Sequence, residues 1–230
     1  MPGLEHLPWA EVWFREIDEA AFAQASAAAR AIGKDGLEVW TTDATPAVVA
    51  FLEPRGYDEV RRYVISELDV EAAPDPDPPA VRLATLAERP DLVPELFAIA
   101  AESYGDQPGR PEQRLESLES WRVWGLDPHP PEAFLIALDD DHVLGYGFLE
   151  IDGDAGTVGF VAVARAARGR GVAGAIKRGH IAWAKTHGAR TLRAANETRL
   201  AGMLALNRRL GFRPLYAEIV LRGPLAPPLA

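Results

Sequence analysis

The segment that most constrains the fold covers residues 161–175, VAVARAARGRGVAGA, and runs from an apolar strand through a glycine-rich loop into a helix. Within it Gly169, Gly171 and Gly174 spell G-x-G-x-x-G. Glycines so placed let backbone N–H groups close around a phosphate at a helix N-terminus. Three arginines lie in the same loop. A purely structural turn has no need of three cations, so the pattern predicts a phosphate-binding strand–loop–helix unit.

The same glycine spacing is the fingerprint of dinucleotide-binding folds, but its context here argues against that class. Such folds place an acidic residue about twenty positions after the glycines, where it binds the ribose. Residues 189–194 contain no Asp or Glu, and the loop follows three predicted strands joined by hairpins. We therefore expect a diphosphate ligand, and a dinucleotide-binding protein is the least favoured alternative.

A proline- and acid-rich segment, EAAPDPDPP at residues 71–79, divides the chain. Its alternating prolines disfavour both helix formation and sheet pairing, which is typical of a linker. It separates an N-terminal domain, residues 1–70, from a C-terminal domain, residues 80–225, and both sizes are ones that domains adopt.

Apolar periodicity in the C-terminal domain predicts the element order β-α-α-β-β-β-α-β-α-β. The second helix should bury Leu115, Leu118, Trp121 and Val123. Hairpins come first and two βα crossovers follow, so we expect an α/β fold with a mixed sheet. The expected strands are 81–86, 133–138, 143–151, 157–163, 191–195 and 214–221, and the expected helices are 91–104, 111–124, 172–187 and 198–210.

The N-terminal domain repeats the back half of the C-terminal one. A shift of 155 residues places Gly33 on Gly188 and Gly56 on Gly211 without gaps, and both copies read helix-Gly-strand-helix-Gly-aromatic-strand. The N-terminal copy has no counterpart of the front strands or of the arginine-rich loop. We therefore expect a degenerate half-unit, whose open sheet edge is covered either by docking within the chain or by a homodimer.

The formal net charge of −10 hides a segmental pattern. Residues 1–79 and 80–154 carry −10 and −11, whereas residues 155–230 carry +11. The acidic total excludes a typical nucleic-acid binder. The basic last third, in contrast, has a local field that attracts small polyanions.

Several site classes are excluded or not expected. The chain has no cysteine, which excludes disulfides, thiolate metal sites and a cysteine nucleophile. Its five histidines are scattered without metal-ligand spacing beside carboxylates, so we expect no metal. No apolar run reaches the ~18 residues of a membrane-spanning helix, and the N-terminus lacks the pattern of an export signal. We expect a soluble, cytoplasmic protein that does not act at a membrane.

Two motifs in the C-terminal domain resemble those of the GNAT N-acetyltransferase superfamily. The first is its acetyl-CoA motif Arg/Gln-x-x-Gly-x-Gly/Ala, which reads Arg168-x-x-Gly171-x-Ala173 here. The second is an Asn after the next strand and a helix ending in Gly-aromatic, here AANETRLAGMLALNRRLGFRP over 194–214. The resemblance covers about 81–224 and looks closest to tandem members of the mycothiol synthase type. This chain departs from them because its first unit is incomplete.

The resemblance implies acetyl-CoA as the acyl donor and places its contacts residue by residue. Backbone groups on the strand before the loop would bind the pantetheine arm and polarise the thioester. N–H groups of the loop would hold the pyrophosphate, and residues further on would line the far side of the ligand. The implied contacts are Val161, Ala162 and Val163 on the strand, Arg168, Gly169, Arg170, Gly171, Val172 and Ala173 in the loop, and Asn196, Met203 and Asn207 beyond it.

The acid and base that many relatives use are both missing from their usual places. Where those relatives carry a Tyr before the Lys/Arg-Leu-Gly-aromatic ending, this chain has Asn207, whose amide could donate a hydrogen bond to the departing sulfur. The strand over 157–163 has no carboxylate to act as base. Glu150 and Asp152, on or just after the preceding strand, are the nearest candidates, and a solvent-facing strand or turn acid is the structural alternative for each. Tyr146 is a further candidate, with a packed strand aromatic as its structural alternative.

We therefore expect an acetyl-CoA-dependent N-acetyltransferase that transfers an acyl group directly to a small primary amine. The acidic front half of the C-terminal domain would favour a cationic amine, with specificity set in the turn-rich loop over 104–111. The alternative from another class is a CoA-binding regulatory module without turnover, motivated by the missing Tyr and the missing strand carboxylate.

Overall fold

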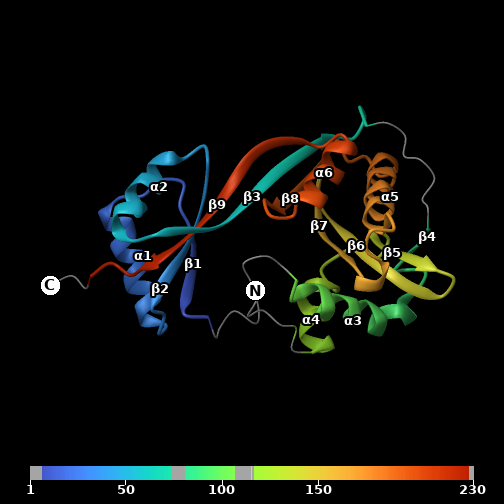
Figure 1. Ribbon diagram of the computed structural model, residues 1–230, viewed down its shortest axis with the longest axis horizontal. Coiled ribbons are helices and arrows are strands. Elements are labelled where there is room, and N and C mark those ends of the chain that lie inside the picture. The colour runs from blue at the N-terminus through green and yellow to red at the C-terminus, as the bar shows by residue number, and fades with distance from the viewer. Residues whose placement is uncertain (1–6, 74–80, 107–114, 116, 228–230) are drawn as a thin grey trace. The chain divides into compact units, whose positions relative to one another are not determined.

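The computed structural model describes residues 7–73, 81–106, 115 and 117–227 (Figure 1). The described strands are hydrogen-bonded in the order β1-β2-β9-β3-β8-β7-β6-β5-β4. The chain divides into two compact units. Of the described residues, the larger unit holds Ser66–Ala195 and Leu200–Pro214, and the smaller unit holds residues 7–65, Asn196–Arg199 and residues 215–227.

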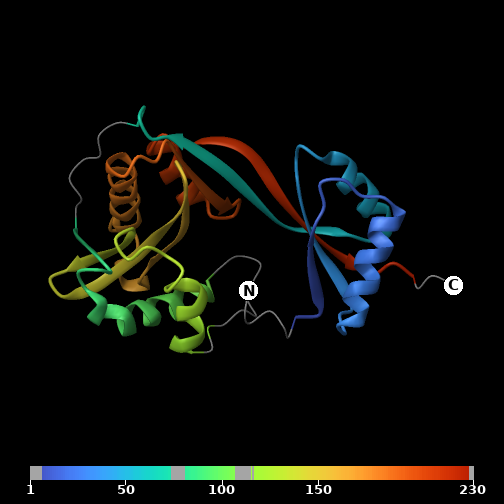
Figure 2. The same cartoon turned by 180° about the vertical axis from the view of Figure 1, so that it is seen from behind.

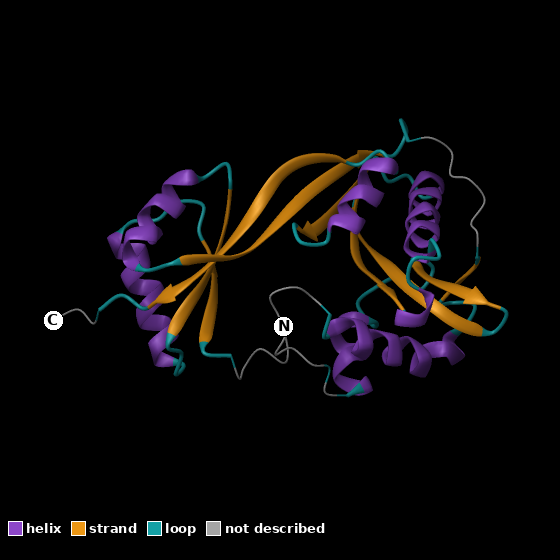
Figure 3. Ribbon diagram, in the orientation of Figure 1, coloured by secondary structure: helices purple, strands orange, loops and turns teal. Residues whose placement is uncertain are grey.

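In the larger unit, neighbouring strands from β4 to β7 are antiparallel, and β8 is parallel to β7 (Figure 3). The mixed α/β sheet expected from the sequence is therefore confirmed. The bounds are β4(Arg82–Thr85), α3(Val93–Tyr104), α4(Leu118–Gly125), β5(Phe134–Asp139), β6(His142–Asp152), β7(Ala155–Val163), α5(Val172–Thr186), β8(Thr191–Glu197) and α6(Ala201–Arg209).

Side-chain alternation along β5 and β6 buries both faces of this sheet. Phe134 and Tyr146 are buried in a cluster with residues of α3 and α4. Leu135 and Ala137, on the opposite face, are buried with Ile176 of α5. Strands that are apolar on both faces are typical of a layer covered by helices on both sides. This packing fixes β6 and β7, on which the candidate site is built.

Helix α4 begins later than the predicted helix over 111–124, part of which lies outside the described residues. Trp121 is buried as expected, and Leu115 and Leu118 pack partly buried against the same core. Val123, in contrast, is 62% exposed. The prediction for Val123 was wrong because a residue two positions after Trp121 points to the other side of a helix with 3.6 residues per turn.

In the smaller unit, β1 is parallel to β2, and β2 is antiparallel to β9. Helices α1 and α2 lie beside this sheet (Figure 2). The core between them and the strands includes Phe22, Leu37 and Leu52. Asp18 begins α1, because its side chain accepts a hydrogen bond of 2.7 Å from the N–H of Ala21. The bounds are β1(Trp9–Trp13), α1(Glu19–Ala31), β2(Gly36–Thr42), α2(Pro46–Leu52), β3(Asp58–Asp69) and β9(Arg213–Pro224).

The repeat expected from the sequence is confirmed by the element bounds. A shift of 155 carries both ends of β2 onto β8 and both ends of β3 onto β9. It also carries the end of α1 onto that of α5 and the start of α2 onto that of α6. Gly33, Gly56, Gly188 and Gly211 have φ between 73° and 94°, a left-handed conformation that favours glycine after a helix. The two copies thus share their turn chemistry as well as their order.

The last strands of the two copies are exchanged. β9, which ends the second copy, pairs with β2 of the first copy from Gly36↔Pro224 to Thr42↔Glu218. β3, which ends the first copy, stands next to β8 of the second in the strand order. The smaller unit is therefore completed by residues from the C-terminal end of the chain.

Candidate functional site

The two parallel strands β7 and β8 are paired along only part of their length. Their register runs from Ala155↔Thr191 to Val158↔Ala194, whereas β7 continues to Val163 and stays paired with β6 up to that residue. In the described part of the chain, residues 159–163 of β7 thus have a strand partner on one side only. This opening between β7 and β8 is the first feature of the site.

A bulge in β7 marks the start of the opening. Leu149 pairs with Val158 and Gly147 with Val161, so β7 has one residue more than β6 between these pairs. The ring of Phe148 lies against Gly159, where a Cβ atom would collide with it. Glycine is therefore required at this position of the bulge.

Backbone direction along β7 separates the three predicted strand residues. The N–H of Ala164 donates to the carbonyl of Leu144 at 2.9 Å, so Ala164 faces β6. Because successive residues of a strand point their polar groups to opposite sides, Ala162 also faces β6, and Val161 and Val163 face the opening. The carbonyl of Val163 there accepts a hydrogen bond of 3.2 Å from Arg168 Nε.

The glycine-rich loop joins β7 to α5 directly beside this opening. A short 3-10 turn, Arg165–Ala167, is followed by Gly169 at φ 76° and by Gly171 at φ 83°, the N-cap residue of α5. As a glycine, Gly171 provides no side-chain cap for the first N–H groups of α5. The first N–H groups of a helix have no partner within it, so an anion at this end would find donors and a favourable helix dipole.

The loop arginines are paired with carboxylates from the preceding acidic segment. Arg165 and Arg168 both bind Asp106, at 2.6 and 2.7 Å, and Arg170 binds Asp139 at 3.0 Å. The hydrogen bonds from Arg165 and then Arg168 lower the pKa of Asp106 to about 2. The positive charge that the sequence places at the loop is therefore largely neutralised by partners about 30 to 60 residues away.

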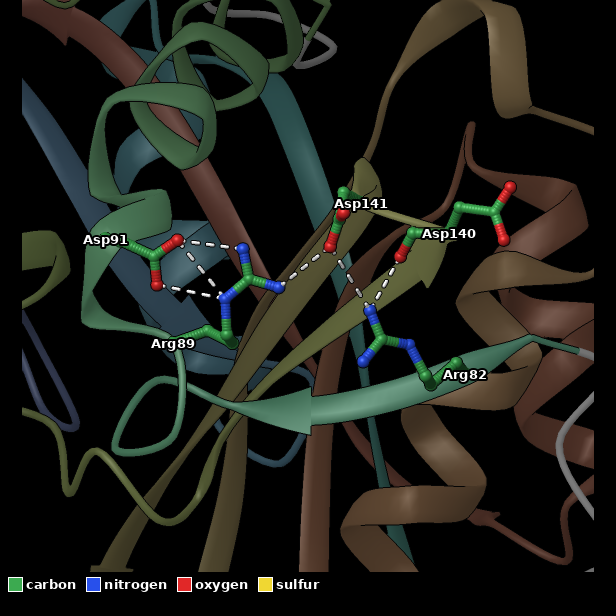
Figure 4. A network of polar contacts seen from close by, with 5 residues as sticks. All are labelled: Arg82, Arg89, Asp91, Asp140 and Asp141. Carbon is green, nitrogen blue, oxygen red and sulfur yellow. Dashed lines mark hydrogen bonds and ion pairs between the residues drawn. The ribbon is translucent and has the colours of Figure 1, made fainter.

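A second group of polar contacts holds the β5–β6 turn (Figure 4), which directly follows Asp139, the partner of Arg170 at the end of β5. Arg89 binds Asp91 at 2.8 Å and Asp141 at 3.4 Å. Arg82 donates to the carbonyl of Asp140 at 2.6 Å. The acidic turn is therefore anchored to β4 and to the segment after it as well as to the loop.

Helix α6 lies beside the first turn of α5. A Cβ atom on Gly174 would lie 3.5 Å from Leu206 Cδ1, an ordinary contact distance. Met203 and Asn207 are on α6, and Asn207 is buried, with 1% of its surface exposed. Asn196, near the end of β8, groups with the smaller unit. The larger unit thus holds the strand, the loop, Met203 and Asn207 of the predicted set.

Glu150 is exposed on β6, on the face that also carries Tyr146 and Phe148. Tyr146 is buried, and burial raises the pKa of its hydroxyl far above the usual value. His129, for which no functional role was expected, stacks its ring on Phe148 with centroids 3.7 Å apart. Burial lowers the pKa of His129, and the charge of Glu150 partly opposes this. No sequence signal places the loop with His129 next to β6.

Two ionisable side chains on α5 are buried and have lowered pKa values, which the sequence analysis did not predict. Lys177 is 2% exposed, and its Nζ lies 5.5 Å from the ring centroid of Phe212. Burial lowers the pKa of Lys177 to about 8. His180 is fully buried, and burial lowers its pKa to about 3, so it is neutral. Because Lys177 and His180 are three residues apart, helical periodicity predicts that both face the buried side of α5.

Two further findings concern metals and membranes. Within the described residues, no group of three or more His, Cys, Asp or Glu side chains is arranged to hold a metal ion. None of the described helices has the length and apolar character needed to cross a membrane.

Solved structures with the same fold include a GCN5-related N-acetyltransferase from Sphaerobacter thermophilus (21% identity, TM-score 0.68). The match covers 88% of this chain and 65% of that one. They also include a tandem GNAT protein from the clavulanic acid biosynthesis pathway (21% identity, TM-score 0.64, 90% of this chain and 70% of that one). A third is a GCN5-related N-acetyltransferase from Kribbella flavida (18% identity, TM-score 0.61, 94% and 79%). At these identities the likeness shows a common fold.

No curated protein matches the chain. This chain spans about two thirds of the length of the Sphaerobacter protein. The model of the acetyltransferase (GNAT) family matches residues 93–212, which is more than half of the chain and contains β7, the loop and α6. The chain therefore belongs to the acetyltransferase (GNAT) family.

Proposed function

We propose that this protein is an acetyl-CoA-dependent N-acetyltransferase that transfers its acyl group directly to a small primary amine. The observation that carries the proposal is the opening between β7 and β8 beyond Val158, in a chain of the acetyltransferase (GNAT) family. Val161 presents its backbone N–H and carbonyl to this opening and Val163 presents its N–H, because the Val163 carbonyl is bonded to Arg168. The pantetheine arm is extended and carries amide groups, so it can pair with this edge as an added strand would.

The glycine-rich loop is suited to the pyrophosphate of the same ligand. Gly169 and Gly171 turn the backbone so that N–H groups between Arg168 and Ala173 lie at the uncapped start of α5. Because the loop arginines are paired with carboxylates, we assign phosphate binding chiefly to these N–H groups. Met203 and the Asn207 amide, which belong to the same unit as the loop, would line the far side of the ligand.

In the proposed reaction the amine nitrogen attacks the thioester carbonyl carbon, a C–N bond forms and the C–S bond breaks. The N–H of Val161 would stabilise the carbonyl oxygen as negative charge develops on it. Glu150 would accept the proton of the amine, directly or through water. Asn207 would donate a hydrogen bond to the sulfur, and a thiol pKa of about 8.5 makes the thiolate a tolerable leaving group.

Two observations favour a second candidate, a CoA-binding module without turnover. Asn207 is buried, and its amide is not an acid that could protonate the leaving thiolate. Glu150 is exposed on the strand before β7 instead of on β7 itself. The two candidates differ in one result. The enzyme releases free CoA in the presence of some amine, and Glu150→Gln slows that release, whereas the module binds CoA and releases none.

The absence of cysteine makes the decisive assay clean, because a thiol reagent then reports only the CoA that is released. We expect acetyl-CoA to bind in isothermal titration, and its thiol to appear when an amine panel that includes cationic amines is added. Release of CoA with none of the amines would leave only the binding module. No binding of acetyl-CoA would remove both candidates.

Gly171→Glu tests the position of the site. The substitution puts a carboxylate among the N–H donors that would hold the pyrophosphate, and the loss of two charge-assisted hydrogen bonds weakens binding by about 100-fold or more. Gly188→Glu is the matched control, since Gly188 has a similar left-handed φ of 79°, open space around it, and lies at the other end of α5. Equal acetyl-CoA affinity in the two variants would contradict the placement.

A further inference from the structure

The carboxylate of Asp106, two residues after the end of α3, is shared by two arginines of the loop. It accepts hydrogen bonds from Arg165 Nη2 at 2.6 Å and Nε at 3.2 Å, and from Arg168 Nη2 at 2.7 Å. Arg165 begins the 3-10 turn between β7 and α5, and Arg168 follows it. One side chain thus holds both ends of the turn that leads into the glycine-rich loop.

Glu102, one helical turn earlier on α3, provides a second anchor. Its Oε2 accepts the backbone N–H of Arg165 at 3.1 Å, and its Oε1 lies 3.8 Å from the Nε of the same arginine. Helix α3 itself packs against β6, β7 and α4, with Leu96 fully buried. Because the helix is held on several sides, its end is a firm support for the loop.

We propose that Asp106 is a positioning residue for the phosphate loop. Its carboxylate holds the turn so that the N–H groups of residues 169–173 converge on one anion. The identity of that anion, the pyrophosphate of acyl-CoA, rests on the proposed function. A glycine-rich loop loses much conformational freedom when it becomes ordered. An anchor that orders the loop in advance removes this cost from ligand binding.

The same contacts argue against a competing role, in which Asp106 imitates a phosphate and has to leave when the ligand binds. Arg168 also donates to the carbonyl of Val163 at 3.2 Å, and the backbone of Arg165 is bonded to Glu102. Both arginines are thus tied to β7 and α3 by further partners. With its pKa at about 2, the Asp106 carboxylate remains charged throughout the pH range of an enzyme assay.

Amide hydrogen exchange of the ligand-free protein tests the positioning role without any ligand. Asp106→Asn keeps the shape of the side chain but removes its charge, and we expect exchange in peptides over residues 165–171 to become at least about tenfold faster. Exchange in the second half of α5 should not change. Asp91→Asn is the matched control, because Asp91 is also an exposed carboxylate paired with an arginine (Figure 4). Unchanged exchange over 165–171 overturns the proposal.

Calorimetric titration with CoA completes the test. Asp106→Asn should weaken CoA binding by about 5- to 50-fold, Asp91→Asn should change it by less than about twofold, and Asp106→Glu should recover part of the loss. The dependence of affinity on salt should keep its slope, since no arginine is released toward the phosphates. Tighter CoA binding with a steeper slope shows competition and overturns the proposal. If the unaltered protein does not bind CoA, the proposed function fails, and the exchange result still decides the role of Asp106.

Discussion

Lys177 offers a quantitative test of the packing around α5. Its side chain is 2% exposed, its Nζ lies over the ring of Phe212, and no carboxylate among the described residues pairs with it. Burial lowers its pKa from 10.5 to about 8, which at about 1.4 kcal/mol per pH unit corresponds to a cost of about 3 kcal/mol for the charged form. We therefore expect Lys177→Met, which keeps the volume and loses the charge, to raise the free energy of unfolding at pH 7 by up to about 3 kcal/mol.

The sign of the pH dependence follows from the same values. Below pH 8 the amine is protonated in both states, so the full cost is present. Between pH 8 and 10.5 Lys177 binds more protons in the unfolded chain than in the folded one, so its own contribution to the stability of the unaltered protein rises with pH. At pH 10 the advantage of Lys177→Met should shrink to about 1 kcal/mol.

Urea denaturation at pH 7 and pH 10 measures both values, and Lys185→Met is the control on the same helix. Lys185 donates to the carbonyl of Ala73 at 2.8 Å, so its substitution should bring no gain at pH 7. A loss of more than about 1 kcal/mol in Lys177→Met at pH 7 would refute the reasoning, because it would mean that the buried charge stabilises the fold.

Two further predictions concern the strand exchange and the bulge. A chain truncated after Pro214 lacks the part of β9 that pairs with β2. We therefore expect the smaller unit to lose its cooperative unfolding transition and its protected amides. A native-like NMR spectrum of that unit would contradict the exchange of β3 and β9. Gly159→Ala forces a methyl group against the Phe148 ring and should destabilise the protein by about 1–3 kcal/mol in chemical denaturation. Gly202→Ala, at an open helical position, should instead stabilise it by up to about 1 kcal/mol, and equal stability of the two variants would count against the described bulge.

Local signals in the sequence were sufficient to predict the order of the elements and the repeat. Glycines in the left-handed conformation end helices in both copies, and apolar periodicity locates the strands between them. The exchange of β3 and β9 could not be predicted in the same way. Both strands have similar patterns, because each ends a copy of the same unit, and only the three-dimensional pairing decides which copy each one joins.

For the candidate site, the sequence predicted the glycine-rich loop but overestimated its free positive charge. Arg168 meets Asp106 from a segment about 60 residues earlier, a pairing that no local pattern encodes. The proximity of His129 to Glu150 likewise depends on the packing of a loop on β6. The direction of Val161 and Val163 follows from alternation once the pairing with β6 is known, and the end of the β7–β8 pairing is visible only in the structure.

The most direct test of the central claim is a structure of the protein with CoA bound. We expect the pyrophosphate within about 3 Å of N–H groups between Arg168 and Ala173, and the pantetheine arm along Val161 and Val163 in the opening beyond Val158. CoA bound elsewhere on the chain, with that stretch of β7 untouched, would contradict it.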